Sequence, residues 1–186
     1  MAGIQEQIGT WMLKRDYRKH KRKKQGKNLQ EANKVAVLFQ AKDEETYKTV
    51  RKYVRFLKEE GIKKVLVLGI IDGKENPFIL PSKLEFDYFN RKDLNLYKLP
   101  RSVVVSNFIA EEYDILLALT DGAQLALTYV LALSKARLKV GRHLQAHQEY
   151  LDLMIQLPAS ADLNDFLPHI NPYLKIFNTN QHVERV

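Results

Sequence analysis

The sequence predicts an α/β protein, a three-layer sandwich with a mostly parallel, Rossmann-like sheet that is preceded by a basic N-terminal helix. Continuous apolar runs at 35–39 and 65–71 are typical of strands that are buried on both faces. Segments with helical periodicity alternate with such runs, which favours right-handed βαβ units. A block of basic residues ahead of the first run indicates the additional helix.

The first βαβ unit is expected over residues 34–71. A strand begins at Lys34, and a helix follows over 42–60, where apolar residues recur every three or four positions. Gly61 is a suitable helix stop, and the second strand is 65–71. An irregular stretch with two prolines then leads to a short strand at 85–89.

The second half of the body carries further strands and helices. Residues 101–109 are ambiguous, and the run Val103-Val104-Val105 favours a strand or a buried turn. Strands are expected over 113–119, 138–141 and 150–157. A helix capped by Thr120 or Asp121 is expected over 122–135. The last helix, 163–177, contains Pro168 and Pro172, which are expected to kink or split it.

The chain divides into a basic helical arm with its linker (1–28), one α/β domain (34–178) and a short tail (179–186). The 186 residues include no cysteine, which excludes thiol catalysis, zinc–thiolate sites and disulfides and fits a cytoplasmic protein. The N-terminus lacks the pattern of a secretory signal, and no apolar run approaches the length of a membrane span.

The positive charge is concentrated in the arm. Between Lys14 and Lys27 there are nine of the 30 basic residues and one of the 22 acidic residues. This segment therefore accounts for the whole formal net charge of +8, and the rest of the chain is balanced. Any general attraction to a polyanion must come from the arm.

The arm is expected to be a helix over residues 4–24 with two different halves. Ile4, Ile8, Trp11 and Met12 form a narrow apolar stripe, so that Trp11 and Ile8 are expected to dock the helix on the body or on a protein neighbour. After Leu13 basic residues cover every face, and such a helix is solvated or is ordered by a partner.

The favoured interpretation is a non-enzymatic RNA-binding protein that is associated with the ribosome or its assembly. Its partners are then RNA, above all ribosomal RNA, and ribosomal proteins, and the arm neutralises phosphates. The expected RNA-binding residues are Lys14, Arg15, Arg18, Lys19, Lys21, Arg22, Lys23, Lys24 and Lys27. Deleting residues 1–27 is expected to leave a folded body.

Two other interpretations of the arm stay open. One is a solvated tail without a partner. The other is a peripheral membrane protein, in which the apolar stripe and the basic run lie on an anionic lipid surface. Four apolar residues are few for that purpose, so a membrane surface is the less favoured partner.

A different alternative is a small-ligand-binding protein or an enzyme. It would use a crevice at the carboxyl ends of the strands, where ligands bind in such sheets. The candidate crevice residues are Asp72, Thr120, Asp121 and Arg142. Neither a phosphate-binding glycine motif nor a Gly-x-Ser-x-Gly elbow is present, so no catalytic residue and no cofactor is assigned, and the small molecule stays unidentified.

The histidines at 143 and 147 are four residues apart, but no third ligand stands at metal-binding spacing, so no metal site is expected. Both are interpreted as surface residues that can join Arg137, Lys139 and Arg142 on an RNA-facing surface. Two carboxylates, Asp114 and Asp152, start or interrupt apolar strands, so partial burial is expected of one or both.

Three segments resemble a family of short, uncharacterised bacterial α/β proteins with a basic N-terminal helix, a domain of unknown function. They are Tyr113-Asp114-Ile115-Leu116-Leu117, Leu133-Ser134-Lys135-Ala136-Arg137-Leu138-Lys139-Val140-Gly141 and Tyr150-Leu151-Asp152-Leu153-Met154-Ile155. The resemblance implies one domain with a basic leader, and it supplies no catalytic residues.

Overall fold

A six-stranded, all-parallel sheet forms the centre of the protein, whose computed structural model describes residues 3–71, 85–158 and 161–176. The strands lie in the order β3-β2-β1-β4-β5-β6, and all five neighbouring pairs are parallel. This is the strand order of the Rossmann fold. The strands are β1 (Lys34–Ala41), β2 (Lys64–Ile71), β3 (Phe86–Asn90), β4 (Ile115–Leu119), β5 (Leu138–Arg142) and β6 (Leu153–Ile155).

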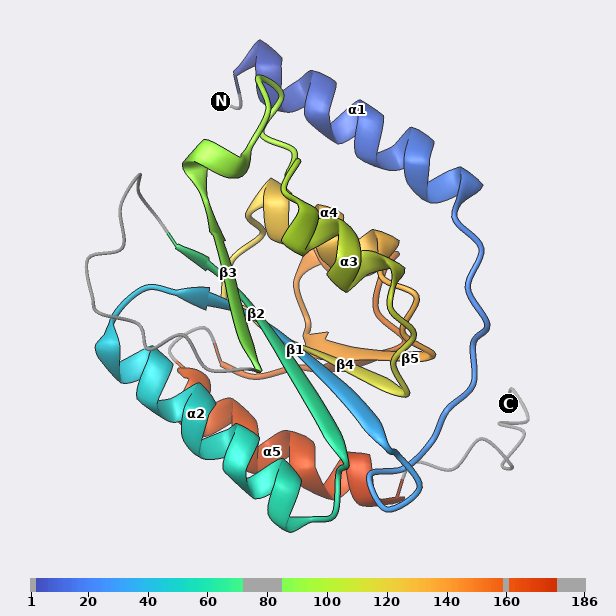
Figure 1. Cartoon of the computed structure of the whole chain (residues 1–186), viewed down its shortest axis with the longest axis vertical. Coiled ribbons are helices and arrows are strands. Elements are labelled where there is room, and N and C mark those ends of the chain that lie inside the picture. The colour runs from blue at the N-terminus through green and yellow to red at the C-terminus, as the bar shows by residue number, and fades with distance from the viewer. Residues whose placement is uncertain (1–2, 72–84, 159–160, 177–186) are drawn as a thin grey trace.

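Helices cover both faces of the sheet, which confirms the predicted sandwich (Figure 1). The helices α2 (Glu44–Glu59) and α5 (Leu163–Ile176) share one core cluster with one face of the sheet. On the other face are α3 (Val103–Ala110) and α4 (Leu125–Leu133). Helix α1 (Ile4–Lys19) lies outside α4, and Leu13 of α1 joins the core of that side.

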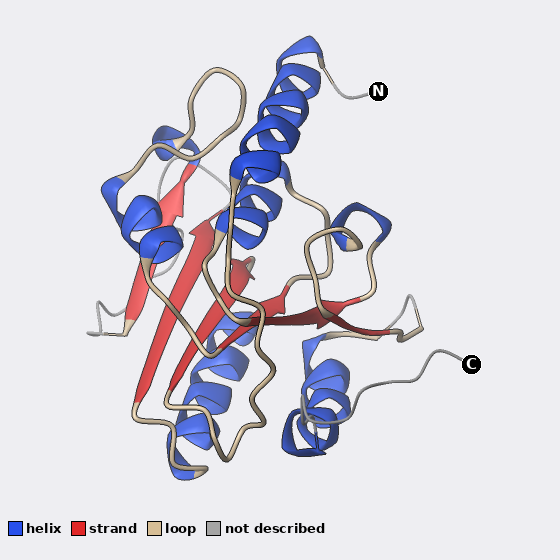
Figure 2. Ribbon diagram, turned by 90° about the vertical axis from the view of Figure 1, so that its right-hand side faces the viewer, coloured by secondary structure: helices blue, strands red, loops and turns tan. Residues whose placement is uncertain are grey.

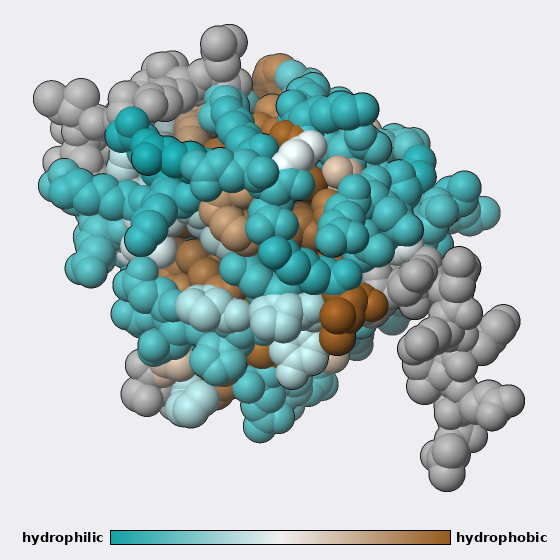
Figure 3. Space-filling view, turned by 90° about the horizontal axis from the view of Figure 1, so that it is seen from below, coloured by the Kyte–Doolittle hydropathy of each residue, from teal (hydrophilic) through white to brown (hydrophobic). Residues whose placement is uncertain are grey.

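The central strands are buried because both faces are covered. Residues 35–39 of β1 are each 0% exposed, and all five residues of β4 are buried. Helix α2 shows the usual amphipathic pattern, with Tyr47, Val50, Val54 and Leu57 buried. From the side of α2 and α5 the surface is mainly hydrophilic, and its hydrophobic areas are separate patches (Figure 3).

Helix α4 differs from α2 in being apolar on nearly every side. Eight of its nine residues are buried, because the sheet covers one side and α1 lies against another. A helix that is hydrophobic all round requires such cover. The position of α1 is therefore part of the fold.

Several local expectations are wrong. Helix α1 ends at Lys19, and residues 20–33 form a linker that includes a short turn and leads to β1 along the amino-terminal edge of the sheet (Figures 1 and 2). Residues 103–110 form a helix, because the Ser102 hydroxyl accepts from the Val105 N–H and caps it.

The ends of two other elements also differ from the expectation. Strand β6 covers only Leu153–Ile155, and neither Thr120 nor Asp121 caps α4, whose N-cap residue is Gln124. Helix α5 is one element that includes Pro168 and Pro172.

One close backbone contact seats α1 on the body. A Cβ at Gly9 would lie 2.1 Å from the carbonyl oxygen of Tyr97 and 2.8 Å from a methyl carbon of Leu125. Real Cβ atoms do not approach other atoms so closely. Glycine is therefore required at this point of the helix.

We expect Gly9→Ala to displace α1 from α4, because the overpacking at such a site costs about 1–3 kcal/mol. The expected results are a lower melting temperature and faster amide hydrogen exchange over residues 4–19. Gly122→Ala is the matched control, since nothing lies within 4 Å of its Cβ position. Equal behaviour of the two variants would contradict this packing.

Candidate functional site

The basic arm is docked on the body by one face of α1. Gly9 and Leu13 are buried on this face, and the ring of Tyr17 packs edge-on against Tyr150 with centroids 4.8 Å apart. The Tyr17 hydroxyl donates to the carbonyl of Glu149 at 2.8 Å. Positions three, four and eight apart share a side of a helix, so α1 has a defined inner face.

The last turn of α4 ends inside the protein, where its carbonyl groups require donors. Lys139 of β5 is 0% exposed and donates from its Nζ to the carbonyls of Leu131 and Ala132, at 2.6 and 2.8 Å. Burial and the charge of Arg22 lower the pKa of Lys139 to about 7, against the opposite effect of Asp152. The prediction that Lys139 lies on an RNA-facing surface is wrong, because the side chain is buried.

The linker after α1 supplies hydrogen-bond donors to the backbone carbonyls that follow α4. The His20 ring, with Nε2–H as donor, lies 3.2 Å from the carbonyl of Ser134. Arg22 donates to the carbonyls of Ala136 and Arg137 at 3.1 and 3.0 Å. Burial lowers the pKa of His20, and the charges of Lys139 and Arg22 lower it further, although the bond to Ser134 acts in the opposite direction.

A nearly buried ion pair fixes the linker. Arg22 donates to both carboxylate oxygens of Asp152, at 2.6 and 2.7 Å, and the two side chains are 6% and 16% exposed. Asp152 also accepts from the backbone N–H of Lys139 at 2.9 Å. Arg22, one of the expected RNA contacts, is thus committed to the body.

A second ion pair lies further along the linker. The Lys27 ammonium is 2.9 Å from Asp114, which also accepts from the backbone N–H groups of Asn33 and Lys34. Burial alone would raise the pKa of Asp114, but these hydrogen bonds together hold it below its ordinary value. The expected partial burial of Asp114 and Asp152 is confirmed.

The outer face of the arm carries the free positive charge. Within the residues that the structure describes, five exposed side chains have neither an ion pair nor a hydrogen bond: Lys14, Arg18, Lys19, Lys21 and Lys23. Two others are exposed but lie near a carboxylate. Lys24 is 3.4 Å from Asp152, and Arg15 is 2.9 Å from Asp16.

The predicted docking of Trp11 and Ile8 on the body is wrong, whereas Met12 of the same stripe is partly buried against the core and docking on a protein neighbour stays a prediction. Ile4, Ile8 and Trp11 are 77%, 38% and 62% exposed, and the Arg15 guanidinium lies over the Trp11 ring at 5.5 Å. The inner face instead uses a glycine and a leucine four residues apart. The spacing of these two residues is a weak sequence signal for the inner face, and the prediction did not use it.

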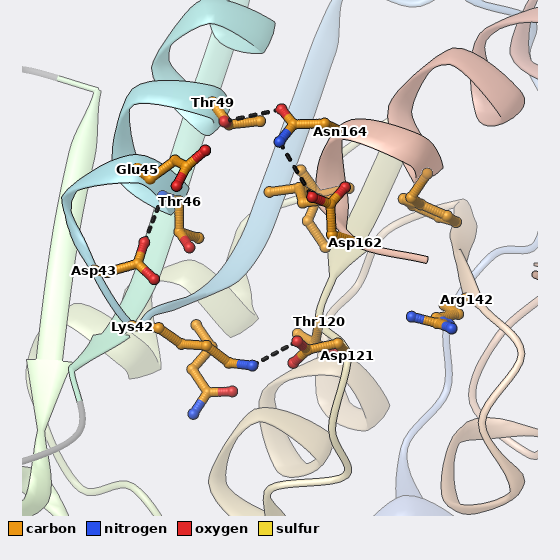
Figure 4. A pocket seen from close by; sticks show the side chains of 14 residues that line it. Lys42, Asp43, Glu45, Thr46, Thr49, Thr120, Asp121, Arg142, Asp162 and Asn164 are labelled. Atoms are coloured by element: carbon orange, nitrogen blue, oxygen red, sulfur yellow. Dashed lines mark hydrogen bonds and ion pairs between the residues drawn. The ribbon is translucent and has the colours of Figure 1, made fainter. Parts of the chain in front are cut away.

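A pocket of about 270 Å³ lies at the carboxyl ends of β1, β4 and β5 (Figure 4). It brings together Thr120, Asp121 and Arg142 of the predicted crevice, whereas Asp72 lies outside the described residues. Lys42 pairs with Asp121 at 2.5 Å. The sequence interpretation missed the residues that α2 and α5 contribute, Asp43, Glu45, Asp162 and Asn164 among them.

The two histidines at 143 and 147 differ in their exposure to solvent. His147 is 2% exposed, which corrects its interpretation as a surface residue, and it is 3.0 Å from the Thr128 hydroxyl. Burial lowers its pKa to about 4, so the ring is neutral at physiological pH. His143 is exposed.

The described part of the chain holds no group of three or more His, Cys, Asp or Glu side chains that could bind a metal ion.

Among the helices that the structure describes, none combines the length and the apolar composition that crossing a membrane requires. This agrees with the absence of a long apolar run in the sequence.

We expect Arg22→Met to lower the free energy of unfolding by about 3 kcal/mol, because it breaks the nearly buried ion pair with Asp152 and removes a donor from the carbonyls of Ala136 and Arg137. Urea denaturation measures this change. Arg18→Met is the control, since Arg18 is exposed and unpaired among the described residues, and it should change stability by less than about 0.5 kcal/mol. Similar small changes in both variants would show that the pair does not hold the linker.

We expect the stability that Lys139 contributes to depend on pH. Between pH 7 and 10 the folded protein holds this amine neutral, while the unfolded chain still binds the proton, so unfolding takes up a proton. Relative to Lys139→Met, the free energy of unfolding of the native protein should rise with pH in this window, by at most about 1.4 kcal/mol per pH unit. Urea denaturation at pH 6, 7.5 and 9 tests this, and a constant difference would mean that the amine stays charged.

No curated protein and no solved structure matches this chain. A family model does match, over residues 5–177, which includes α1 except for its first residue, the linker and the six strands that the structure describes. The expected resemblance to a domain of unknown function is thereby confirmed, and the chain belongs to the family of unknown function DUF6913.

Proposed function

We propose that the protein binds RNA through the outward-facing cations of α1 and the linker, and that this contact attaches it to the ribosome or to an assembling ribosomal particle. The observation that carries the proposal is the set of five exposed, unpaired cations between Lys14 and Lys23, as seen among the described residues. Such a partner would place the protein in the cytoplasm and requires no catalytic residue.

The docked inner face supports this proposal. Because Leu13, Tyr17 and Arg22 hold the arm on the body, the free cations project from a backbone that is already ordered. Binding then costs less conformational entropy than it would for a flexible tail. This arrangement also argues against a merely solvated tail.

Several cations of the body are engaged in ion pairs. Lys34 and Lys64 approach Glu111 at 2.5 and 3.4 Å, and Lys58 pairs with Glu85. Further pairs join Lys175 to Glu60 and Lys42 to Asp121. The arm groups five free positive charges between Lys14 and Lys23, although Arg51, Lys52 and Arg55 of α2 are also exposed and unpaired among the described residues.

An exposed aromatic ring favours unpaired bases as part of the ligand. Trp11 is 62% exposed beside Arg15, and both groups offer flat surfaces on which splayed bases stack. We therefore expect single-stranded or looped RNA to bind more tightly than a regular duplex.

We expect replacement of Lys14, Arg18, Lys19, Lys21 and Lys23 by glutamine to weaken RNA binding and to lower its salt dependence. Each phosphate contact contributes about 0.7 to the slope of log K against log salt for a single strand, so losing five reduces the slope by about 3 to 4. Fluorescence anisotropy with a labelled loop RNA over a range of KCl concentrations measures both quantities.

The matched control replaces five exposed cations of the body that have no ion pair among the described residues, namely Arg51, Lys52, Arg55, Lys63 and Lys92, by glutamine. Both variants change the net charge equally, so a general charge effect weakens binding in both. An equal loss would overturn the assignment to the arm. Co-sedimentation with ribosomal particles tests the attachment to the ribosome. If the protein floats with anionic vesicles and does not bind RNA, a membrane surface is the favoured partner.

A further inference from the structure

The pocket at the carboxyl edge of the sheet lies where a ligand is expected in this topology. Strands β1 and β4 are neighbours, but the chain continues from β1 to one side of the sheet and from β4 to the other. The loops after the two strands therefore diverge and leave a crevice. Leu119 of β4 and Leu163 and Phe166 of α5 form part of its apolar lining.

The lining of the pocket carries uncompensated negative charge. Four carboxylates face two basic groups, and both basic groups are already engaged. Lys42 pairs with Asp121, and Arg142 donates to the carbonyls of Ala161 and Pro158, at 2.8 and 2.5 Å. Asp43, Glu45 and Asp162 have no ion-pair partner among the described residues, and Figure 4 shows Asp43 and Asp162 on opposite sides of the hollow.

Two observations disfavour a phosphate or a metal ion as the ligand of this pocket. A phosphate would compete with the helix caps, because Asp43 accepts from the Thr46 N–H and Asp162 from the Asp165 N–H. A metal ion is disfavoured because the described carboxylates and histidines form no group that could hold one. The carboxylates are spread around the pocket, which suits a larger cation.

A buried hydroxyl without a partner points to a missing ligand group. Thr120 lines the pocket and is 7% exposed, and its Oγ1 finds no hydrogen-bond partner within the described structure. An unsatisfied buried hydroxyl is costly, so its retention here requires a reason. The oxygen is closed off from solvent, so a polar ligand in the pocket would pair with it after the Thr120 side chain turns towards the hollow, and this would supply the reason.

We propose that this pocket binds a small organic cation of the amine or guanidine class. The carboxylates of Asp43, Glu45 and Asp162 would receive its charged group, Thr120 would hydrogen-bond to it, and its alkyl part would lie against Leu119, Leu163 and Phe166. The volume of about 270 Å³ is just below the range for drug-sized ligands, so the ligand is smaller than those.

The test measures the melting temperature and the heat of binding of the full chain with five single probes. Putrescine, spermidine and agmatine represent the proposed class, glucose is a neutral polyol, and AMP is an anion. We expect at least one amine or guanidine to raise the melting temperature, because a ligand stabilises the state that binds it. Failure of all three cations at millimolar concentration, or an equal shift with glucose or AMP, would overturn the proposal.

Three variants separate binding from general stability. Asp43→Asn and Asp162→Asn keep a good helix cap while removing a charge, so the affinity for the active cation should fall at least tenfold in each with little loss of folding. Thr120→Val should raise the melting temperature of the free protein and lower the affinity. Glu59→Gln, at the other end of α2 from the pocket, is the charge-matched control and should do neither. Unchanged affinity for the cation in all three pocket variants would mean that the cation binds elsewhere.

The affinity for RNA should be the same in the three pocket variants and in the control as in the native protein.

Discussion

The hydrogen bonding of the end of α4 is the constraint on which the rest of the structure depends. This helix ends inside the protein, and the carbonyl groups that follow Val130 must find donors there, because unpaired buried carbonyls are costly. Lys139 comes from the sheet, while His20 and Arg22 come from the linker, and Asp152 balances the positive charge. The segment before β1 is consequently an integral part of the α/β body. Removing residues 1–27 would leave Asp114 and Asp152 without their cationic partners, so truncation is a poor test of what the arm binds.

This constraint divides the nine basic residues of the arm by role. Arg22 and Lys27 form ion pairs with partly buried carboxylates, and a change at either would alter folding as well as binding. The residues on the outer face can be changed without loss of such contacts. A run of positive charge that looks uniform in the sequence is therefore two interleaved sets, one that holds the fold and one that is available to a polyanion.

The sequence predicted the sheet well and the arm poorly, for physical reasons. Strands that are buried on both faces must be continuously apolar, and this pattern is visible in one dimension. The run Val103-Val104-Val105 favours a strand by local propensity, but the Ser102 cap and the packing of Val105 and Phe108 make it a helix. The inner face of α1 was missed because its main determinant is Gly9, where the absence of a side chain permits close approach. The crevice was found because strand ends meet at one edge, but Asp43 and Asp162 come together only through the packing of α2 and α5.

The linker, which carries Lys21 and Lys23 of the proposed RNA surface, and the pocket lie at opposite edges of the sheet, and this separates their electrostatic effects. The linker crosses the amino-terminal edge and the pocket opens at the carboxyl edge, with the eight residues of β1 between them. At about 3.3 Å per residue that strand spans about 26 Å, which is more than two Debye lengths at physiological ionic strength. The cations of the linker therefore do not neutralise the negative pocket. If both proposals hold, a polyanion and a small cation would bind at separate places on one folded chain, without competition between them.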